Sequence, residues 1–176
     1  GQAQWVNLVK DEGYVFSNFS DLALGTNGEI YVVGSQQGDV ASSRNAWMAQ
    51  YDGDGNAVWS VTIDGPTGSV DGLSGVAVLP SGDLAVAGQL SESVGGRNLW
   101  FGVYSGADGS EVWSQTLDGS DSDTDAGSAV VVDVDGNLVV GGYVTAPVTA
   151  TDQDMFVGKY SADGTEIWTA IIDGIA

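Results

Sequence analysis

The amino-acid sequence predicts an all-β protein built from repeated four-stranded units, and three observations carry this prediction. The 176 residues include 27 Gly and only 3 Pro, a composition that favours tight turns between short strands. Tryptophan recurs at almost equal intervals, at Trp5, Trp59, Trp113 and Trp168. No stretch keeps a helical period of apolar residues, so short strands are the expected elements.

Two further anchors share the period of the tryptophans. A glycine follows each of the first three at a constant interval, at Gly34, Gly88 and Gly142, and a tyrosine comes after it at Tyr51, Tyr104 and Tyr160. The glycine-to-tyrosine interval varies slightly between the copies, which indicates a surface loop between them. The sequence thus predicts a single domain, residues 1–176, with units at about 5–58, 59–112 and 113–167 and a terminal strand at 168–176.

Four strands are expected in each unit, joined by turns that contain Asp-Gly, Asn-Gly or Ser-Gly. In the middle of the chain the first three strands are expected at 75–79, 83–88 and 99–104, and the strand that carries the Trp at 58–63. The second strand is almost entirely apolar, which predicts burial on both faces. The fourth strand, as in 58–63, alternates apolar and polar residues, which predicts one wet face.

A four-stranded unit with a buried second strand and a half-exposed fourth strand, repeated along the chain at this period, is typical of a β-propeller blade. The sequence therefore predicts a propeller-like array of three four-stranded antiparallel units plus an extra N-terminal strand centred on Trp5. An irregular β-sandwich is the alternative fold. Propellers usually close with four or more blades, so the array is either part of a longer chain, or pairs with a second chain, or joins chains head to tail.

The third unit carries a motif, "DGNLVVGGY…DMFVGKYSADGTEIW", that resembles the bacterial SBBP-type β-propeller repeat and, more loosely, quinoprotein-like propellers. An Asp precedes the first strand at Asp71 and Asp125, whereas the first unit departs from the pattern with Ser17 and Lys10. The resemblance implies a secreted or surface-attached protein in which the repeat is a non-catalytic scaffold. It transfers no catalytic residue.

The charge balance excludes several function classes. With 24 Asp and Glu against 4 Lys and Arg, the net charge of −20 disfavours nucleic acid and anionic membrane surfaces as partners. No apolar run approaches the ~20 residues of a membrane span, so no membrane insertion is expected. Cys and His are both absent, which removes thiolate metal sites and the commonest general base. We expect no enzymatic activity.

One loop is a candidate calcium site. Asp118, Asp121, Asp123 and Asp125 place four carboxylates close together in the sequence, and Ca²⁺ prefers such oxygen ligands. The alternative is a solvated acidic loop in a very acidic protein. Calcium is the only cofactor that the sequence suggests.

Aromatic and basic residues suggest a glycan site as a second possibility. Trp47 and Trp100 occupy one repeat position, and Arg44 and Arg97 each lie shortly before them. In a propeller, the loops before the first strand (10–17, 64–71, 118–125) share one end with those after the second strand (35–44, 89–97, 143–153), so glycan binding is expected there. The alternative is that the tryptophans pack between blades and the arginines form local ion pairs.

The two terminal copies of the Trp strand differ from the internal ones. Where internal copies carry Ser and Thr on the expected wet face, the first carries Val6 and Leu8 and the last carries Ile171. Exposed apolar strands are association sites, so Trp5, Val6, Leu8, Trp168 and Ile171 are the predicted assembly interface. The sequence favours an extracellular structural, self-assembling or adhesive module that forms a homo-oligomer or filament, with a glycan-binding propeller as the alternative.

Overall fold

The computed structural model describes residues 17–37, 43–66, 69–93, 96–119, 124–145 and 153–173. These ranges hold twelve strands: β1 (Ser17–Leu24), β2 (Ile30–Gln37), β3 (Arg44–Tyr51), β4 (Ala57–Ile63), β5 (Gly72–Val78), β6 (Leu84–Ser93), β7 (Gly96–Tyr104), β8 (Glu111–Leu117), β9 (Ala126–Val132), β10 (Leu138–Thr145), β11 (Gln153–Tyr160) and β12 (Glu166–Ile172). Among the described residues there is no helix of the length and apolarity that a membrane span requires.

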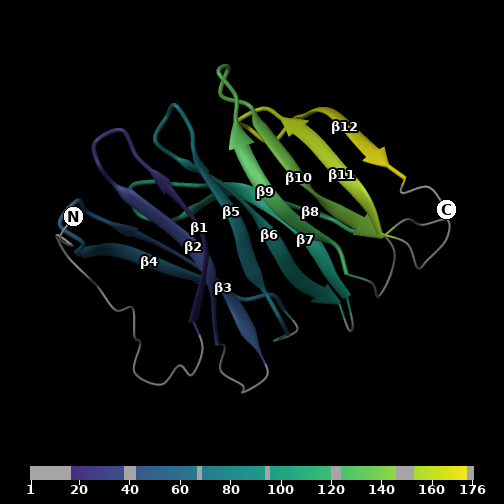
Figure 1. The fold of residues 1–176 in the computed structure, drawn as a ribbon, viewed down its shortest axis with the longest axis horizontal. Coiled ribbons are helices and arrows are strands. Elements are labelled where there is room, and N and C mark those ends of the chain that lie inside the picture. The colour runs from purple at the N-terminus through teal and green to yellow at the C-terminus, as the bar shows by residue number, and fades with distance from the viewer. Residues whose placement is uncertain are drawn as a thin grey trace, which may run out of the picture.

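The strands form three separate four-stranded antiparallel sheets, which we call blades 1, 2 and 3. Blade 1 is β1–β4, blade 2 is β5–β8 and blade 3 is β9–β12, and each keeps the strand order of the sequence. Figure 1 shows the blades side by side in chain order. The predicted all-β fold of three four-stranded units is confirmed. The extra N-terminal strand centred on Trp5 lies outside the described residues.

The first strands of the three blades are neighbours. β5 packs against β1, and β9 packs against β5, so these strands lie together in Figure 1, while the fourth strands of the two end blades, β4 and β12, lie further out. This is the arrangement of propeller blades around an axis lined by their first strands.

Burial follows the two sequence patterns. In β6, Leu84, Ala85, Val86 and Ala87 are all buried, because both faces of this strand are covered. In β4, partly buried and exposed residues alternate over most of the strand. The predictions of a buried second strand and a half-exposed fourth strand are therefore confirmed in these copies.

Each blade has two faces, and we call the face towards the following blade its leading face and the opposite one its trailing face. The first inter-blade core joins the leading face of blade 1 (Tyr31, Val33, Met48) to the trailing face of blade 2 (Leu84, Val86, Trp100). The second joins the leading face of blade 2 (Ala87, Leu99, Phe101) to the trailing face of blade 3 (Leu138, Val140, Phe156). The repeated apolar positions thus build the core by stacking one blade on the next.

The repeated tryptophan fastens each blade to the next. The indole Nε1–H of Trp59 donates to the Gly106 carbonyl at 3.2 Å, and that of Trp113 donates to the Ala162 carbonyl at 2.9 Å. Both carbonyls belong to the turn before the fourth strand of the following blade. In the second contact Gly164, which has a φ of 88°, leaves room for the Trp113 ring. The repeat spacing of Trp therefore reflects packing between blades.

Candidate functional site: the open face of blade 3

The leading face of blade 3 has no blade beyond it in the described part of the chain. Cross-strand partners share a face of a sheet, and the register places three rows here. The first row is Val131, Val139, Lys159 and Trp168, the second is Ala129, Gly141, Val157 and Ala170, and the third is Tyr143, Met155 and Ile172. Lys159 is the one charged residue in these rows.

The apolar side chains on this face are much more exposed than their counterparts in the other blades. Met155 is 58% exposed, whereas Leu99, at the same repeat position in blade 2, is fully buried against blade 3. Val131, Trp168 and Ile172 are 58%, 44% and 48% exposed. Soluble proteins rarely leave such contiguous apolar surface uncovered unless it is an interaction site.

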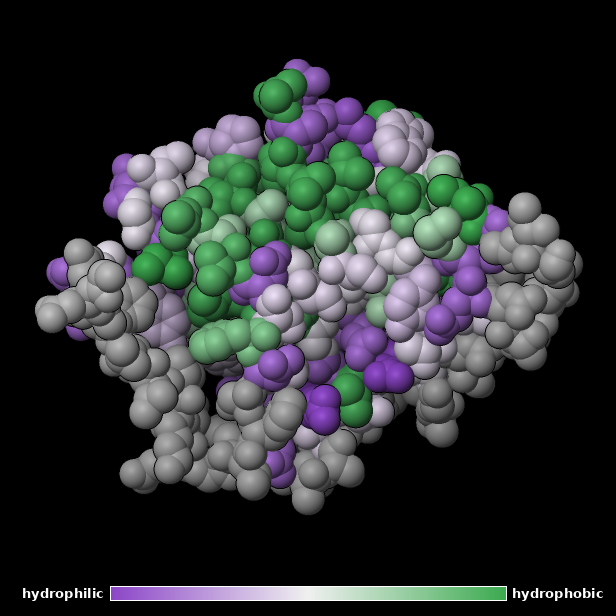
Figure 2. Space-filling model, in the orientation of Figure 1, coloured by the Kyte–Doolittle hydropathy of each residue, from purple (hydrophilic) through white to green (hydrophobic). Residues whose placement is uncertain are grey.

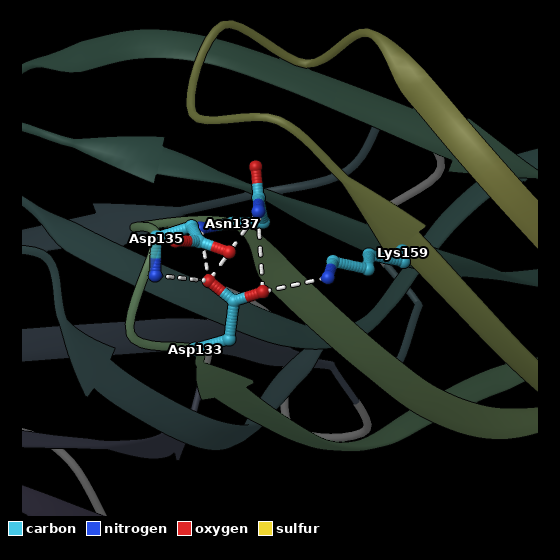
Figure 3. A network of polar contacts seen from close by, with 4 residues as sticks. All are labelled: Asp133, Asp135, Asn137 and Lys159. Carbon is cyan, nitrogen blue, oxygen red and sulfur yellow. Dashed lines mark hydrogen bonds and ion pairs between the residues drawn. The ribbon is translucent and has the colours of Figure 1, made fainter.

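One ion pair lies at the edge of this face. The Lys159 ammonium lies 2.7 Å from the Asp133 carboxylate, which also accepts hydrogen bonds from the backbone N–H groups of Asp135 and Asn137. Figure 3 shows that Lys159 reaches from β11 to the turn between β9 and β10, where Asn137 adds side-chain hydrogen bonds. The pairing with Lys159, followed by the hydrogen bonds from Asn137, lowers the pKa of Asp133. The network holds the turn against the sheet at the margin of the face.

The opposite end of the array also exposes apolar residues. On the trailing face of blade 1, Phe19, Leu22 and Leu24 of β1 are all more than half exposed. Their counterparts in blade 2 are Leu73, Val76 and Val78, which pack in the core against blade 1. Another four residues of this trailing face are already buried, namely Val32, Trp47, Ala49 and Tyr51. The inner strand β1 is therefore the exposed part of this end.

The inner strands connect the two ends through an apolar band. Figure 2 shows apolar side chains gathered over the upper part of this view, where β1, β5 and β9 run in Figure 1.

The predicted assembly residues that the structure describes are both exposed, but they lie on opposite faces of β12. Trp168 is on the leading face, in register with Lys159, whereas Ile171 is in register with Phe156 and so belongs to the trailing face. Trp5, Val6 and Leu8 lie outside the described residues. The sequence reasoning missed Met155, Val131 and Ile172, although comparing each repeat position with its buried counterparts in units 1 and 2 could have found them.

The structure describes only part of the predicted calcium loop. Asp121 and Asp123 lie outside the described residues. Asp125 is fully buried, and its carboxylate accepts hydrogen bonds from the backbone N–H groups of Gly119 and Thr145, both at 2.6 Å. Within the described ranges, no three acidic side chains gather as metal ligands would. Calcium binding by Asp118, Asp121, Asp123 and Asp125 stays a prediction.

Asp71 makes the same contacts as Asp125, one blade earlier. Its carboxylate accepts from Gly65 N–H and Ser91 N–H, both at 2.7 Å. Gly65 lies in the loop before β5, and Ser91 lies near the end of β6, so the two loop sets do share one end of the blades, as the sequence predicted. The Asp before the first strand of blades 2 and 3 is a structural clamp whose role the repeat pattern did not reveal.

The predicted glycan residues are split between core and surface. Trp47 packs against Phe19 with ring centroids 5.9 Å apart, and Trp100 packs against Tyr104 at the same distance. Both tryptophans are buried, which favours the packing interpretation. Arg44 and Arg97 lie at the starts of β3 and β7, where their backbones form isolated parallel β-bridges with Val70 and Thr124 of the following loops. A glycan role for these arginines stays a prediction.

Comparison with known proteins places the fold. No family model and no curated protein sequence matches this chain. A gluconolactonase from Xanthomonas campestris matches with 14% identity and a TM-score of 0.55, over 96% of this chain and 52% of that chain. The β-propeller domain of the Trilobed protease from Pyrococcus furiosus, described as having an open velcro topology, matches with 12% identity and a TM-score of 0.53, over 92% and 45%. A fucose lectin from Kordia zhangzhouensis matches with 12% identity and a TM-score of 0.46, over 85% and 95%.

The first two of these comparisons support the propeller type of fold that the sequence predicted. At such low identity the likeness concerns the fold alone. The chain spans about half the length of the gluconolactonase and of the protease domain. Membership of the SBBP repeat family is not confirmed.

Proposed function

We propose that this protein is a non-enzymatic, extracellular structural module that assembles through the end faces of its blade array. The observation that carries the proposal is the open leading face of blade 3. Its apolar positions correspond to those that the following blade covers on blades 1 and 2. The occupant that we propose is the exposed inner strand β1 of blade 1 in a second copy of the chain.

The internal interfaces supply the template for this contact. In each, a leading face with a tryptophan at its outer edge meets a trailing face of aliphatic and aromatic residues. The chain exposes a leading face on blade 3, and at the other end it exposes Phe19, Leu22 and Leu24 of β1, while the rest of that trailing face is already buried. A contact between the two would continue the existing core from one chain to the next.

Two copies could also close a ring. This chain covers 52% and 45% of the two similar propeller chains, so two copies supply about as much sheet as one of those proteins. If both ends meet in the same pair, the dimer is closed and symmetric. If each end meets a different copy, the same contact builds a filament.

The remaining parts of the proposal rest on composition. The absence of His removes the commonest general base, which favours a structural over an enzymatic role. The net charge of −20 favours a soluble, well-solvated module. Burying one Val, Leu or Met side chain contributes about 1.5–3 kcal/mol, so the four exposed apolar side chains of the open face can supply useful association energy.

Sedimentation velocity of three purified variants tests the proposal. Trp168→Ser and Met155→Ser each remove apolar surface from the open face and should weaken self-association at least about tenfold. Val134→Ser is the matched control, because Val134 is 99% exposed in the turn after β9 and lies off the face. The proposal fails if the native chain does not associate, or if all three variants associate as the native chain does.

A further inference from the structure

Every inner strand contains a one-residue bulge, and the bulged residue is always serine. In β1 the register skips Ser20, between Phe19 opposite Gly34 and Asp21 opposite Val33. The register skips Ser74 of β5 and Ser128 of β9 in the same way. The three serines lie at equal intervals in the sequence, so the bulge is part of the repeat.

A close backbone approach accompanies each bulge. The glycine opposite it, at Gly34, Gly88 or Gly142, lies so near the first strand that a Cβ atom would run into a backbone carbonyl there. Only glycine fits at this position, which explains the second sequence anchor. Bulges are frequent beside binding sites because they re-aim a side chain out of the regular alternation.

The three bulged serines line one cavity near the loop end of the inner strands. Its volume is about 270 Å³, and Ser35, Gln89 and Tyr143 also line it. All three blades therefore contribute to its wall. Figure 2 shows paler, more polar side chains below the apolar band, towards this end of the inner strands.

The charges around the cavity limit the kind of ligand. The Asp71 carboxylate belongs to the wall, but each of its oxygens already accepts a backbone N–H at 2.7 Å. The exposed Arg44 side chain is the cation among the lining residues. A net charge of −20 opposes an anionic ligand, and hydroxyls without available carboxylates make a weak cation site.

The remaining polar side chains of the wall are neutral and can both donate and accept hydrogen bonds. Serine hydroxyls, the Gln89 amide and the Tyr143 phenol all have this property. A ligand that matches them must itself carry several groups that donate and accept. Small pockets with a few converging polar groups are the usual form of such sites.

We propose that this cavity binds a small neutral polyol of the monosaccharide class, held by the hydroxyls of Ser20, Ser74 and Ser128. Arg44 also lines the cavity. The site lies within one chain, and it shares only Tyr143 with the rows of the open face, so binding can be measured on the single chain.

Saturation-transfer NMR with the methyl glycosides of glucose, galactose, mannose, fucose and N-acetylglucosamine tests the site. Sodium acetate and calcium chloride serve as anionic and cationic probes. The comparison variant is Ser20→Ala/Ser74→Ala/Ser128→Ala, and Ser60→Ala, an exposed serine of β4, is the matched control. Loss of three hydroxyls should weaken binding of the responding glycoside about tenfold or more, whereas the control should bind as the native chain does.

Three outcomes would overturn the proposal: no glycoside responds, only acetate or calcium binds, or the triple variant binds with unchanged affinity. Circular dichroism of the triple variant checks that its fold is intact. If the triple variant does not fold, Gln89→Leu replaces it, with the same expected loss of binding and the same overturning result.

Discussion

Trp113 and Trp168 occupy the same repeat position in blades 2 and 3, yet only Trp113 is covered by a following blade in the described part of the chain. Trp113 packs beside Gly164 and donates to the Ala162 carbonyl at 2.9 Å, whereas Trp168 is 44% exposed. Replacing each by Ala should therefore have different effects on the isolated chain. This pair isolates the energetic contribution of the inter-blade contact.

The size of the difference follows from the contacts. Trp113→Ala removes a partly buried indole and one hydrogen bond, which together should lower the free energy of unfolding by about 2–4 kcal/mol. Trp168→Ala removes a side chain that is already half in water and should cost less than about 1 kcal/mol. Urea unfolding followed by circular dichroism, at dilutions where the chain is monomeric, measures both.

Equal losses in the two variants would refute this reasoning. If Trp168→Ala were as costly as Trp113→Ala in the monomer, Trp168 would be buried within its own chain and the leading face of blade 3 would not be open. If neither change were costly, the repeated tryptophan would not fasten the blades.

Three further predictions concern other parts of the fold. Asp71→Ala should lower the free energy of unfolding by about 3–5 kcal/mol, because it leaves two buried backbone N–H groups without an acceptor, and urea unfolding would contradict this by showing a loss below about 1 kcal/mol. Lys159 lowers the pKa of Asp133, so the charged carboxylate stabilises the fold fully above its ordinary pKa, and this stabilisation is lost as the pH falls through the lowered pKa. Asp133→Asn should therefore be less stable than the native chain near neutral pH but not in strong acid. A difference in stability that stays constant with pH would argue against the ion pair. Calcium should raise the melting temperature if residues 118–125 bind it, whereas equal melting curves in calcium and EDTA would exclude that site.

The repeat made the architecture predictable from the sequence. Regular spacing of Trp59 and Trp113, with apolar second strands between Gly-containing turns, defined four strands per unit, and the structure has them in that order. Trp47 and Trp100 are both buried, and Trp100 lies in the core between blades 1 and 2, which agrees with the packing interpretation of this repeat position.

The open face of blade 3 was less predictable than the fold, because a missing neighbouring blade leaves no pattern in the sequence of the strand. Met155 looks like any core residue of its strand, and only the arrangement of blades reveals that its face lacks a neighbour in the described part of the chain. The role of Ser74 depends on a register shift that leaves no mark in strand periodicity. Asp125 appeared as one of four acidic residues in a loop, although in the structure it is buried and caps two backbone N–H groups.

Native mass spectrometry of the purified chain over a range of dilutions tests the central claim most directly. One chain has a mass of 18.0 kDa. If the open face of blade 3 receives blade 1 of a second copy, the spectrum should show a species of twice that mass, or higher multiples if the contact builds a filament. These species should dissociate on dilution and should be depleted in Trp168→Ser. A single species with the mass of one chain at every concentration would contradict the account.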